Sequence, residues 1–218
     1  MMKIPARNRA GWATRCALAM ACLLLGACNV LSPSTAPAQT FYSLDAAAVS
    51  GTLERPDPLA PTLLVAPPRA AAGFDSPRII YTRQPHALDY FAHSEWVDTP
   101  ARMLGPLLVS ALERNGAFRA VGVTSGAAAG DLRLDTELVR LQHEFQTQPS
   151  RVRFTLRATL VDDRTRRVLA WREFDTAVPS ATEDPYGGVI AANQAVQIAL
   201  QELSAFCIET LRQRPPKP

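Results

Sequence analysis

The chain has 218 residues, four cysteines and a formal net charge of +3. Residues 1–27 hold four of its 23 basic residues and no acidic residue, which leaves 19 basic against 20 acidic residues in the rest. A near-neutral body of this length predicts one globular domain and excludes a generally basic, nucleic-acid-binding protein.

The first 28 residues combine a basic start, a short apolar run and a terminal cysteine. The basic residues are Lys3, Arg7, Arg9 and Arg15. The apolar run at 16–25 is too short to span a bilayer of about 30 Å as a helix, and small residues precede Cys28. This order resembles the signal and lipobox of bacterial lipoproteins, which implies acylation of Cys28 and cleavage before it. The alternative is an ordinary secretory signal followed by a chance cysteine.

We therefore expect residues 1–27 to be a signal peptide and 28–39 to be a lipidated cysteine with a flexible tether. A single domain is expected over 40–213, followed by a tail at 214–218. A cysteine that carries two or more acyl chains stays in its leaflet, and Asn29 favours the outer membrane by resemblance to Gram-negative sorting. Only Cys207 remains in the body, which excludes an intramolecular disulfide, and its place on an apolar helical stripe predicts a buried thiol.

Apolar runs and turn residues predict the elements of the first half. Strands are expected at 41–44, 62–66, 78–83 and 87–91. The Asp-Thr-Pro motif at 98–100 predicts a helix start, Asn-Gly at 115–116 predicts a left-handed stop, and Pro106 predicts a kink between them. The apolar stripe of this helix consists of Leu104, Leu107, Leu108, Ala111 and Leu112.

The second half alternates more regularly between apolar and polar residues. Strands are expected at 117–123, 131–143, 151–161 and 168–178, and a change of phase at Val139 predicts a β-bulge. An Asp-Pro pair at 184–185 predicts the start of a long final helix. Its apolar stripe consists of Val189, Ala192, Val196, Ala199, Leu200, Leu203, Phe206, Cys207 and Leu211. Together these elements predict an α+β fold, a mostly antiparallel sheet with two amphipathic helices packed on one face.

The sequence contains no combination of residues that predicts catalysis, and we expect no cofactor. His86, His93 and His143 lie at no metal-ligand spacing, and no cysteine pair accompanies them. The motifs of serine hydrolases, phosphate-binding loops and zinc proteases do not occur. A lipid-anchored hydrolase is therefore the least favoured function.

Two groups of side chains are candidates for a partner surface. The aromatic group consists of Phe74, Tyr81, Tyr90 and Trp96. Core packing is the alternative explanation for this group. The arginine stripe, on the strand at 151–161, consists of Arg151, Arg153 and Arg157. It forms either a solvated strand face or a contact with lipid headgroups or an acidic partner.

Several short segments form a pattern over residues 40–212. They are Phe41-Tyr42-Ser43-Leu44 after the lipobox, LLVAPP leading through Phe74-Asp75-Ser76-Pro77 into RIIYTR, Trp96 before the first helix, and FDTAVPS followed by AANQAVQIALQEL. The pattern resembles the ABC-type transport auxiliary lipoproteins, the group that includes PqiC.

The resemblance implies a non-catalytic component that works with an MCE-domain protein and its ABC permease and ATPase in lipid transport. Such a protein would be anchored in the outer membrane through Cys28, face the periplasm of a Gram-negative bacterium and serve as a docking partner. Lipid is a further candidate ligand, nucleic acid is not, and homo-oligomers stay open. The alternative function is outer-membrane assembly, of the lipopolysaccharide or β-barrel insertion type.

Overall fold

The computed structural model describes residues 38–45, 55–124 and 130–213. The chain divides into two units, Met1–Ala38 and Gln39–Pro218, and the elements below all belong to the second unit. The expected signal peptide, Cys28, most of the tether and the tail at 214–218 lie outside the described residues. Within the described part of the chain, no helix is long and apolar enough to cross a membrane.

Three long antiparallel strands, paired in chain order, form one side of a nine-stranded sheet. They are β7 (Leu132–Glu144), β8 (Arg151–Asp162) and β9 (Val168–Pro179). The predicted alternation of β8 is confirmed, because its apolar side chains from Val152 to Leu160 are buried. The predicted bulge is confirmed as a register shift of β7 against β8 between Leu138 and Arg140. This extra residue changes which side chains of β7 face the core.

Six shorter strands extend this sheet, most of them in parallel pairs. They are β1 (Thr40–Tyr42), β2 (Thr62–Val65), β3 (Arg69–Ala70), β4 (Arg78–Thr82), β5 (Asp89–Trp96) and β6 (Ala120–Val123). Strand β7 pairs in parallel with β2, β3 and β4 and antiparallel with β8, so it joins the two halves of the sheet. The sequence did not predict β3, because it has two residues and follows a pair of prolines.

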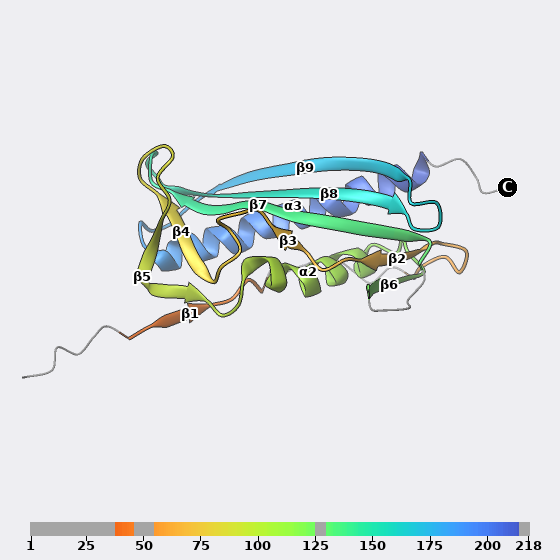
Figure 1. Ribbon diagram of the computed structural model, residues 1–218, viewed down its shortest axis with the longest axis horizontal. Helices are drawn as coiled ribbons and strands as arrows, with labels where there is room; N and C mark the ends of the chain where they lie inside the picture. Colours follow the sequence, from red (N-terminus) through yellow and green to blue (C-terminus); the bar gives the residue numbers. More distant parts are fainter. Residues whose placement is uncertain (1–37, 46–54, 125–129, 214–218) are drawn as a thin grey trace, which may run out of the picture. The chain divides into compact units, whose positions relative to one another are not determined.

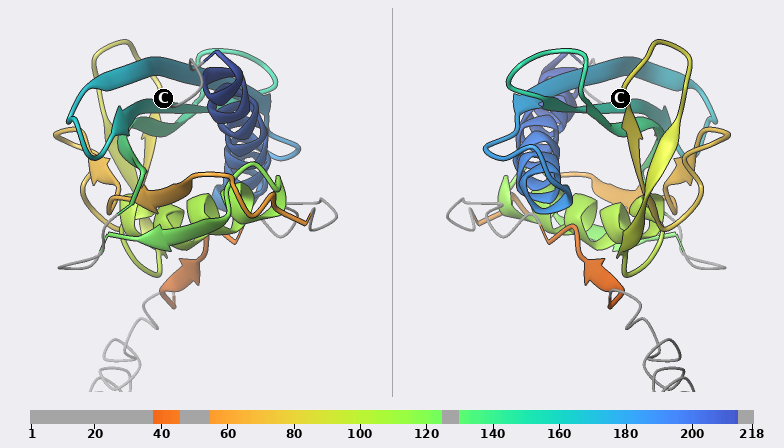
Figure 2. Two further views of the ribbon diagram at one scale, coloured as in Figure 1. Left: turned by 90° about the vertical axis from the view of Figure 1, so that its right-hand side faces the viewer. Right: turned by 90° about the vertical axis from the view of Figure 1, so that its left-hand side faces the viewer.

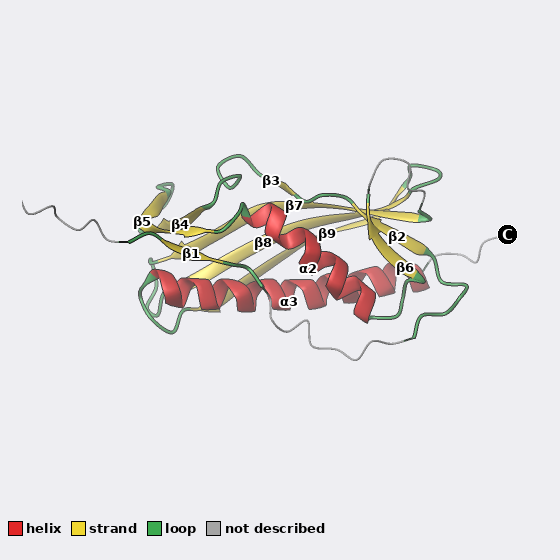
Figure 3. Cartoon of the chain, turned by 90° about the horizontal axis from the view of Figure 1, so that it is seen from below, coloured by secondary structure: helices red, strands yellow, loops and turns green. Residues whose placement is uncertain are grey.

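Both helices, α2 (Pro100–Arg114) and α3 (Pro185–Arg212), pack on one face of the sheet as predicted (Figure 1, Figure 3). Helix α2 begins after Thr99, whose side chain makes no capping hydrogen bond. Gly116 has a φ of 63°, which confirms the left-handed stop. Helix α3 is capped by Asp184, whose Oδ1 accepts a hydrogen bond from the Gly187 backbone N–H at 2.8 Å.

The core lies between the sheet and the helices, with the long strands curving over one side and α2 closing the opposite side (Figure 2). The apolar stripe predicted for α3 is buried from Val189 to Cys207. Burial raises the pKa of the Cys207 thiol to about 12, so this cysteine behaves as a buried apolar residue, as predicted.

Candidate docking groove

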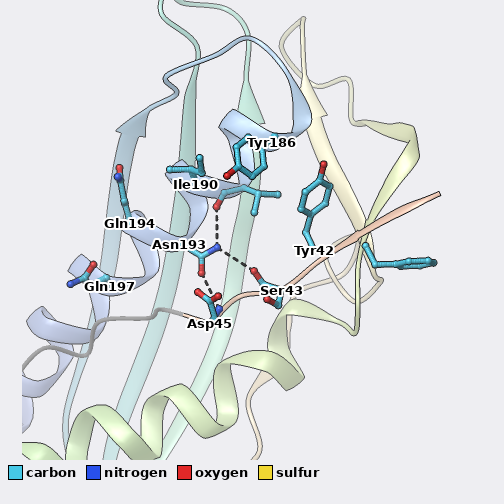
Figure 4. Close-up of a pocket in the computed structure, with 10 residues that line it drawn as sticks. Tyr42, Ser43, Asp45, Tyr186, Ile190, Asn193, Gln194 and Gln197 are labelled. Carbon is cyan, nitrogen blue, oxygen red and sulfur yellow. Dashed lines mark hydrogen bonds between the residues drawn. The ribbon is translucent and has the colours of Figure 1, made fainter. Parts of the chain in front are cut away.

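An open groove lies between the β1 segment and the first half of α3 (Figure 4). Its volume is about 450 Å³. One wall is the segment from Phe41 to Asp45, and the other is the face of α3 between Tyr186 and Gln197. The walls come from opposite ends of the chain, so the groove exists only in the folded domain.

Asn193 ties the two walls together. Its Nδ2 donates hydrogen bonds to the carbonyl oxygens of Ser43 at 3.2 Å and Val189 at 3.1 Å. Its Oδ1 accepts a hydrogen bond from the Asp45 backbone N–H at 3.0 Å. One side chain therefore fixes the position of the segment after β1 against α3 (Figure 4).

Exposed apolar side chains occur on both walls of the groove. Phe41 is 59% exposed, Tyr186 is 60% exposed and Ile190 is 37% exposed. The rings of Tyr42 and Tyr186 face each other across the groove with their centroids 6.4 Å apart. Aromatic surface left in water beside a concave site favours a binding partner, because aromatic residues are enriched at the centres of interfaces.

The charge of the groove favours a protein partner over an anionic lipid. Among the described residues that line it, Asp45 is the only charged one, and Gln194 and Gln197 add neutral amides. Phosphate headgroups are recognised by cations, which this lining lacks. Amides beside apolar side chains suit the mixture of polar backbone and apolar side chains that a protein surface presents.

The arginine stripe faces outward, and each of its members is paired with carboxylates of the neighbouring strands. Arg151 and Arg153 donate to Glu144 at 2.8 and 3.0 Å. Arg153 also pairs with Asp175 of β9 at 2.6 Å. Arg157 pairs with carboxylates on β7 and β9 at 3.0 and 2.8 Å. This pairing favours a structural role for the stripe over contact with lipid headgroups or an acidic partner.

The aromatic group does not form one surface. Trp96 is 3% exposed and packs in the core, so it offers nothing to a partner. Tyr81 is half-buried between two phenylalanine rings, at centroid distances of 4.7 and 5.8 Å. Tyr90 is 52% exposed, with the Arg78 guanidinium 4.1 Å above its ring. Phe74 is half-buried in the loop between β3 and β4. Only Tyr90 remains as an exposed candidate.

His143 is the one buried histidine, and its surroundings do not form an active site. Its Nε2 lies 2.8 Å from the Oγ of Ser150, which is 0% exposed and cannot meet a substrate. His86 and His93 are exposed. Among the residues that the structure describes, no group of three side chains could hold a metal ion.

We expect His143 to make the stability of the domain depend on pH below neutrality. Burial lowers the pKa of His143 against the opposing charges of Glu183 and Asp184, and its buried Nδ1 has no hydrogen-bond partner. As the pH falls, the His143 imidazole therefore takes up a proton in the unfolded chain at a higher pH than in the folded domain, near the ordinary histidine pKa of about 6.5. Stability should be nearly constant above about pH 7 and fall below it by up to ~1.4 kcal/mol per pH unit.

Urea unfolding between about pH 5.5 and 7.5 measures this dependence, because carboxylates stay ionised in both states over most of that window. The variant His143→Gln should lose the slope. An unchanged slope in that variant would assign the effect to another group.

The sequence model of the ABC-type transport auxiliary lipoprotein component family matches residues 42–204, which is most of the chain. The chain belongs to this family. Membership indicates a membrane-anchored protein of the cell envelope with an auxiliary role in ABC-type transport. The match includes nearly all of both groove walls.

Solved structures share the fold of this auxiliary lipoprotein. The crystal structure of a protein from Xanthomonas campestris is 28% identical, with a TM-score of 0.67 over 80% of this chain and 97% of that chain. An uncharacterized protein of known structure is 12% identical, with a TM-score of 0.60 over 78% and 99% of the two chains. The second likeness shows the fold alone. Comparison with the curated proteins finds no match.

Sequence reasoning missed the groove. Tyr186 and Ile190 lie outside the buried stripe of α3, and this was a usable signal that both are exposed. The opposite wall could not be found this way, because no local pattern places Phe41 beside a helix that begins at Pro185.

Proposed function

We propose that this protein is the docking component of a lipid-transport system that contains an MCE-domain protein, an ABC permease and an ATPase. Its signal peptide, residues 1–27, is removed, and the acylated Cys28 and the tether to residue 39 hold the domain at the periplasmic face of the outer membrane. The domain binds the MCE-domain protein and catalyses no reaction.

The groove between β1 and α3 is the observation that carries this proposal. Its aromatic walls are exposed, its lining is almost uncharged, and Asn193 holds the two walls in place. A preformed apolar groove binds a protein surface without a large cost for ordering its own side chains. Membership of a transport-auxiliary family implies a partner within an ABC-type transport system, which supports the proposal.

Ile190 and Ile198 offer a matched pair of test positions on α3. They are 37% and 40% exposed, and only Ile190 lines the groove. A photocrosslinking residue at position 190 should give an adduct with the MCE-domain protein in native envelopes, and one at position 198 should not. Ile190→Glu should weaken this association by at least about tenfold, since it places a charge at an apolar contact. Ile198→Glu should leave it unchanged.

The identity of the adduct decides between the two functions. An adduct with an outer-membrane barrel from position 190 would favour outer-membrane assembly. Equal adducts from both positions, or none from either, would contradict docking through the groove. Far-UV circular dichroism of both glutamate variants checks that the domain remains folded.

A further inference from the structure

The turn between β8 and β9 presents a basic surface to solvent. Its exposed arginines are Arg164, Arg166 and Arg167. The neighbouring carboxylates are turned into the fold. Asp162 is 7% exposed and accepts hydrogen bonds from the backbone N–H and the Oγ1 of Thr165, both at 2.9 Å. Asp163 pairs with Arg133 at 3.2 Å and more distantly with Arg166 at 3.7 Å. The outermost charges of the turn are therefore positive.

Arg166 holds its place in this turn at a local conformational cost. Its φ of 59° lies in the left-handed region, which glycine adopts more easily than any residue with a Cβ. Its side chain is 71% exposed. The backbone at this position suits glycine better, yet Arg166 adds a positive charge to the turn.

Two exposed apolar side chains follow the turn on β9. Val168 is 53% exposed and Trp171 is 65% exposed. Trp171 points to the same side of the strand as Glu173 and Asp175, which is the face of the sheet away from α3. Arginines beside a tryptophan and an aliphatic residue are typical of a surface that enters the headgroup region of a membrane.

We propose that this tip, residues 164–168 with Trp171, binds the anionic headgroups of the membrane in which the protein is anchored. The tip and the β1 end lie at opposite ends of the long strands (Figure 1). The 12 residues of β8 span about 40 Å, and the chain from Cys28 to Gln39 extends to about 40 Å at most. A domain lying along the membrane can therefore be held at both ends.

This contact leaves the docking groove open. The groove lies between β1 and α3, whereas Trp171 is on the face of the sheet away from α3. Each arginine near an anionic surface strengthens binding by about fivefold, which is weak for a free protein. The lipid anchor makes this weak contact sufficient, because it keeps the tip at a high effective concentration beside the membrane.

Tryptophan fluorescence tests the contact directly. The processed chain would keep two tryptophans, Trp96 in the core and Trp171 at the tip, so Trp171→Phe supplies the background signal. The full lipid-modified protein is reconstituted into vesicles of phosphatidylcholine and phosphatidylglycerol, with or without bromine atoms on the acyl chains. We expect brominated phosphatidylglycerol to quench Trp171, and quenching to fall in phosphatidylcholine alone and at high salt.

Charge variants separate this contact from changes in folding. The triple variant Arg164→Gln, Arg166→Gly and Arg167→Gln should lose about a hundredfold in affinity for the anionic surface, and with it most of the quenching. Arg102→Gln, which removes an exposed arginine of α2, should leave the quenching unchanged. Arg166→Gly alone should weaken quenching while its urea midpoint stays the same or rises, because glycine relieves the left-handed backbone.

The inference rests on the lipid anchor but not on the docking groove. Vesicle flotation reports the anchor independently, since a protein without acylated Cys28 would not float. A protein that floats while Trp171 is equally bright in brominated and plain vesicles would overturn the membrane contact. Quenching that persists in the triple variant would overturn the role of the arginines. Binding of the tip to an acidic protein, without quenching, would assign the surface to a protein partner instead.

Discussion

Replacing Gly188 by alanine should lower the free energy of unfolding by about 2–4 kcal/mol, through overpacking and the loss of a buried hydrogen bond. A Cβ at this position would lie 2.6 Å from the Nδ1 of His143 and 3.3 Å from its Cγ. The ring cannot simply move, because it stacks on Phe145 at a centroid distance of 4.1 Å and contacts Ser150 at 2.8 Å. The gain in helix propensity from glycine to alanine, about 1 kcal/mol, does not offset this cost.

Chemical denaturation of Gly188→Ala beside Gly122→Ala measures the effect. A Cβ at Gly122 meets nothing closer than a Leu64 methyl group at 3.9 Å, so this control should stay within about 0.5 kcal/mol of the unchanged protein. Adding His143→Ala to Gly188→Ala removes the obstructing ring, so the two costs should be far from additive. If the two losses in unfolding free energy were additive, contact with the His143 ring would not be the reason that position 188 requires glycine.

Replacing Glu144 by alanine should cost about 2 kcal/mol, because it breaks a partly buried charge cluster. The Glu144 side chain is 9% exposed and accepts from Arg151 at 2.8 Å and Arg153 at 3.0 Å. Burial alone would raise the pKa of Glu144, but hydrogen bonds from Arg151, Gln142 and Arg153 outweigh it and lower the pKa. The stabilisation that ionised Glu144 provides should therefore be fully present above its unfolded pKa of about 4.3. It should be lost as the pH falls through the lower pKa of the folded state.

Arg157→Ala supplies the matched control for Glu144→Ala. Arg157 also makes two ion pairs, but its side chain is 44% exposed and its partners are 36% and 41% exposed. Solvent screens such pairs, so we expect a much smaller loss than in Glu144→Ala. Urea titrations at neutral pH compare the two variants. An equal loss in both would show that burial of Glu144 adds nothing to its ion pairs.

The elements that sequence predicted best are those with a strong local period. The alternation of 151–161 and the stripe from Val189 to Cys207 each define which face is buried, whatever packs against it. The bulge near Leu138 was visible for the same reason, as a break in that alternation. The parallel pairs of β2, β3 and β4 were not predictable, because their partner in β7 lies far along the chain.

Partner surfaces were harder to predict because they depend on which side chains meet. Arg151, Arg153 and Arg157 form an exposed basic stripe in the sequence, but strand register places Glu144 and other carboxylates beside them. Tryptophan is a residue type that is common at interfaces, but Trp96 lies in the core. The two groove walls are tied by Asp45 and Asn193, which are 148 residues apart.

The position of β7 between its partner strands sets the order in which the sheet can form. Strands β2, β3 and β4 precede Leu132–Glu144 in the chain, so they reach the compartment where the domain folds before the partner they share. Pairings over such long sequence separations form slowly, and unpaired apolar strands are prone to aggregate. The first half of the chain is therefore exposed to aggregation until β7 is available to pair with it.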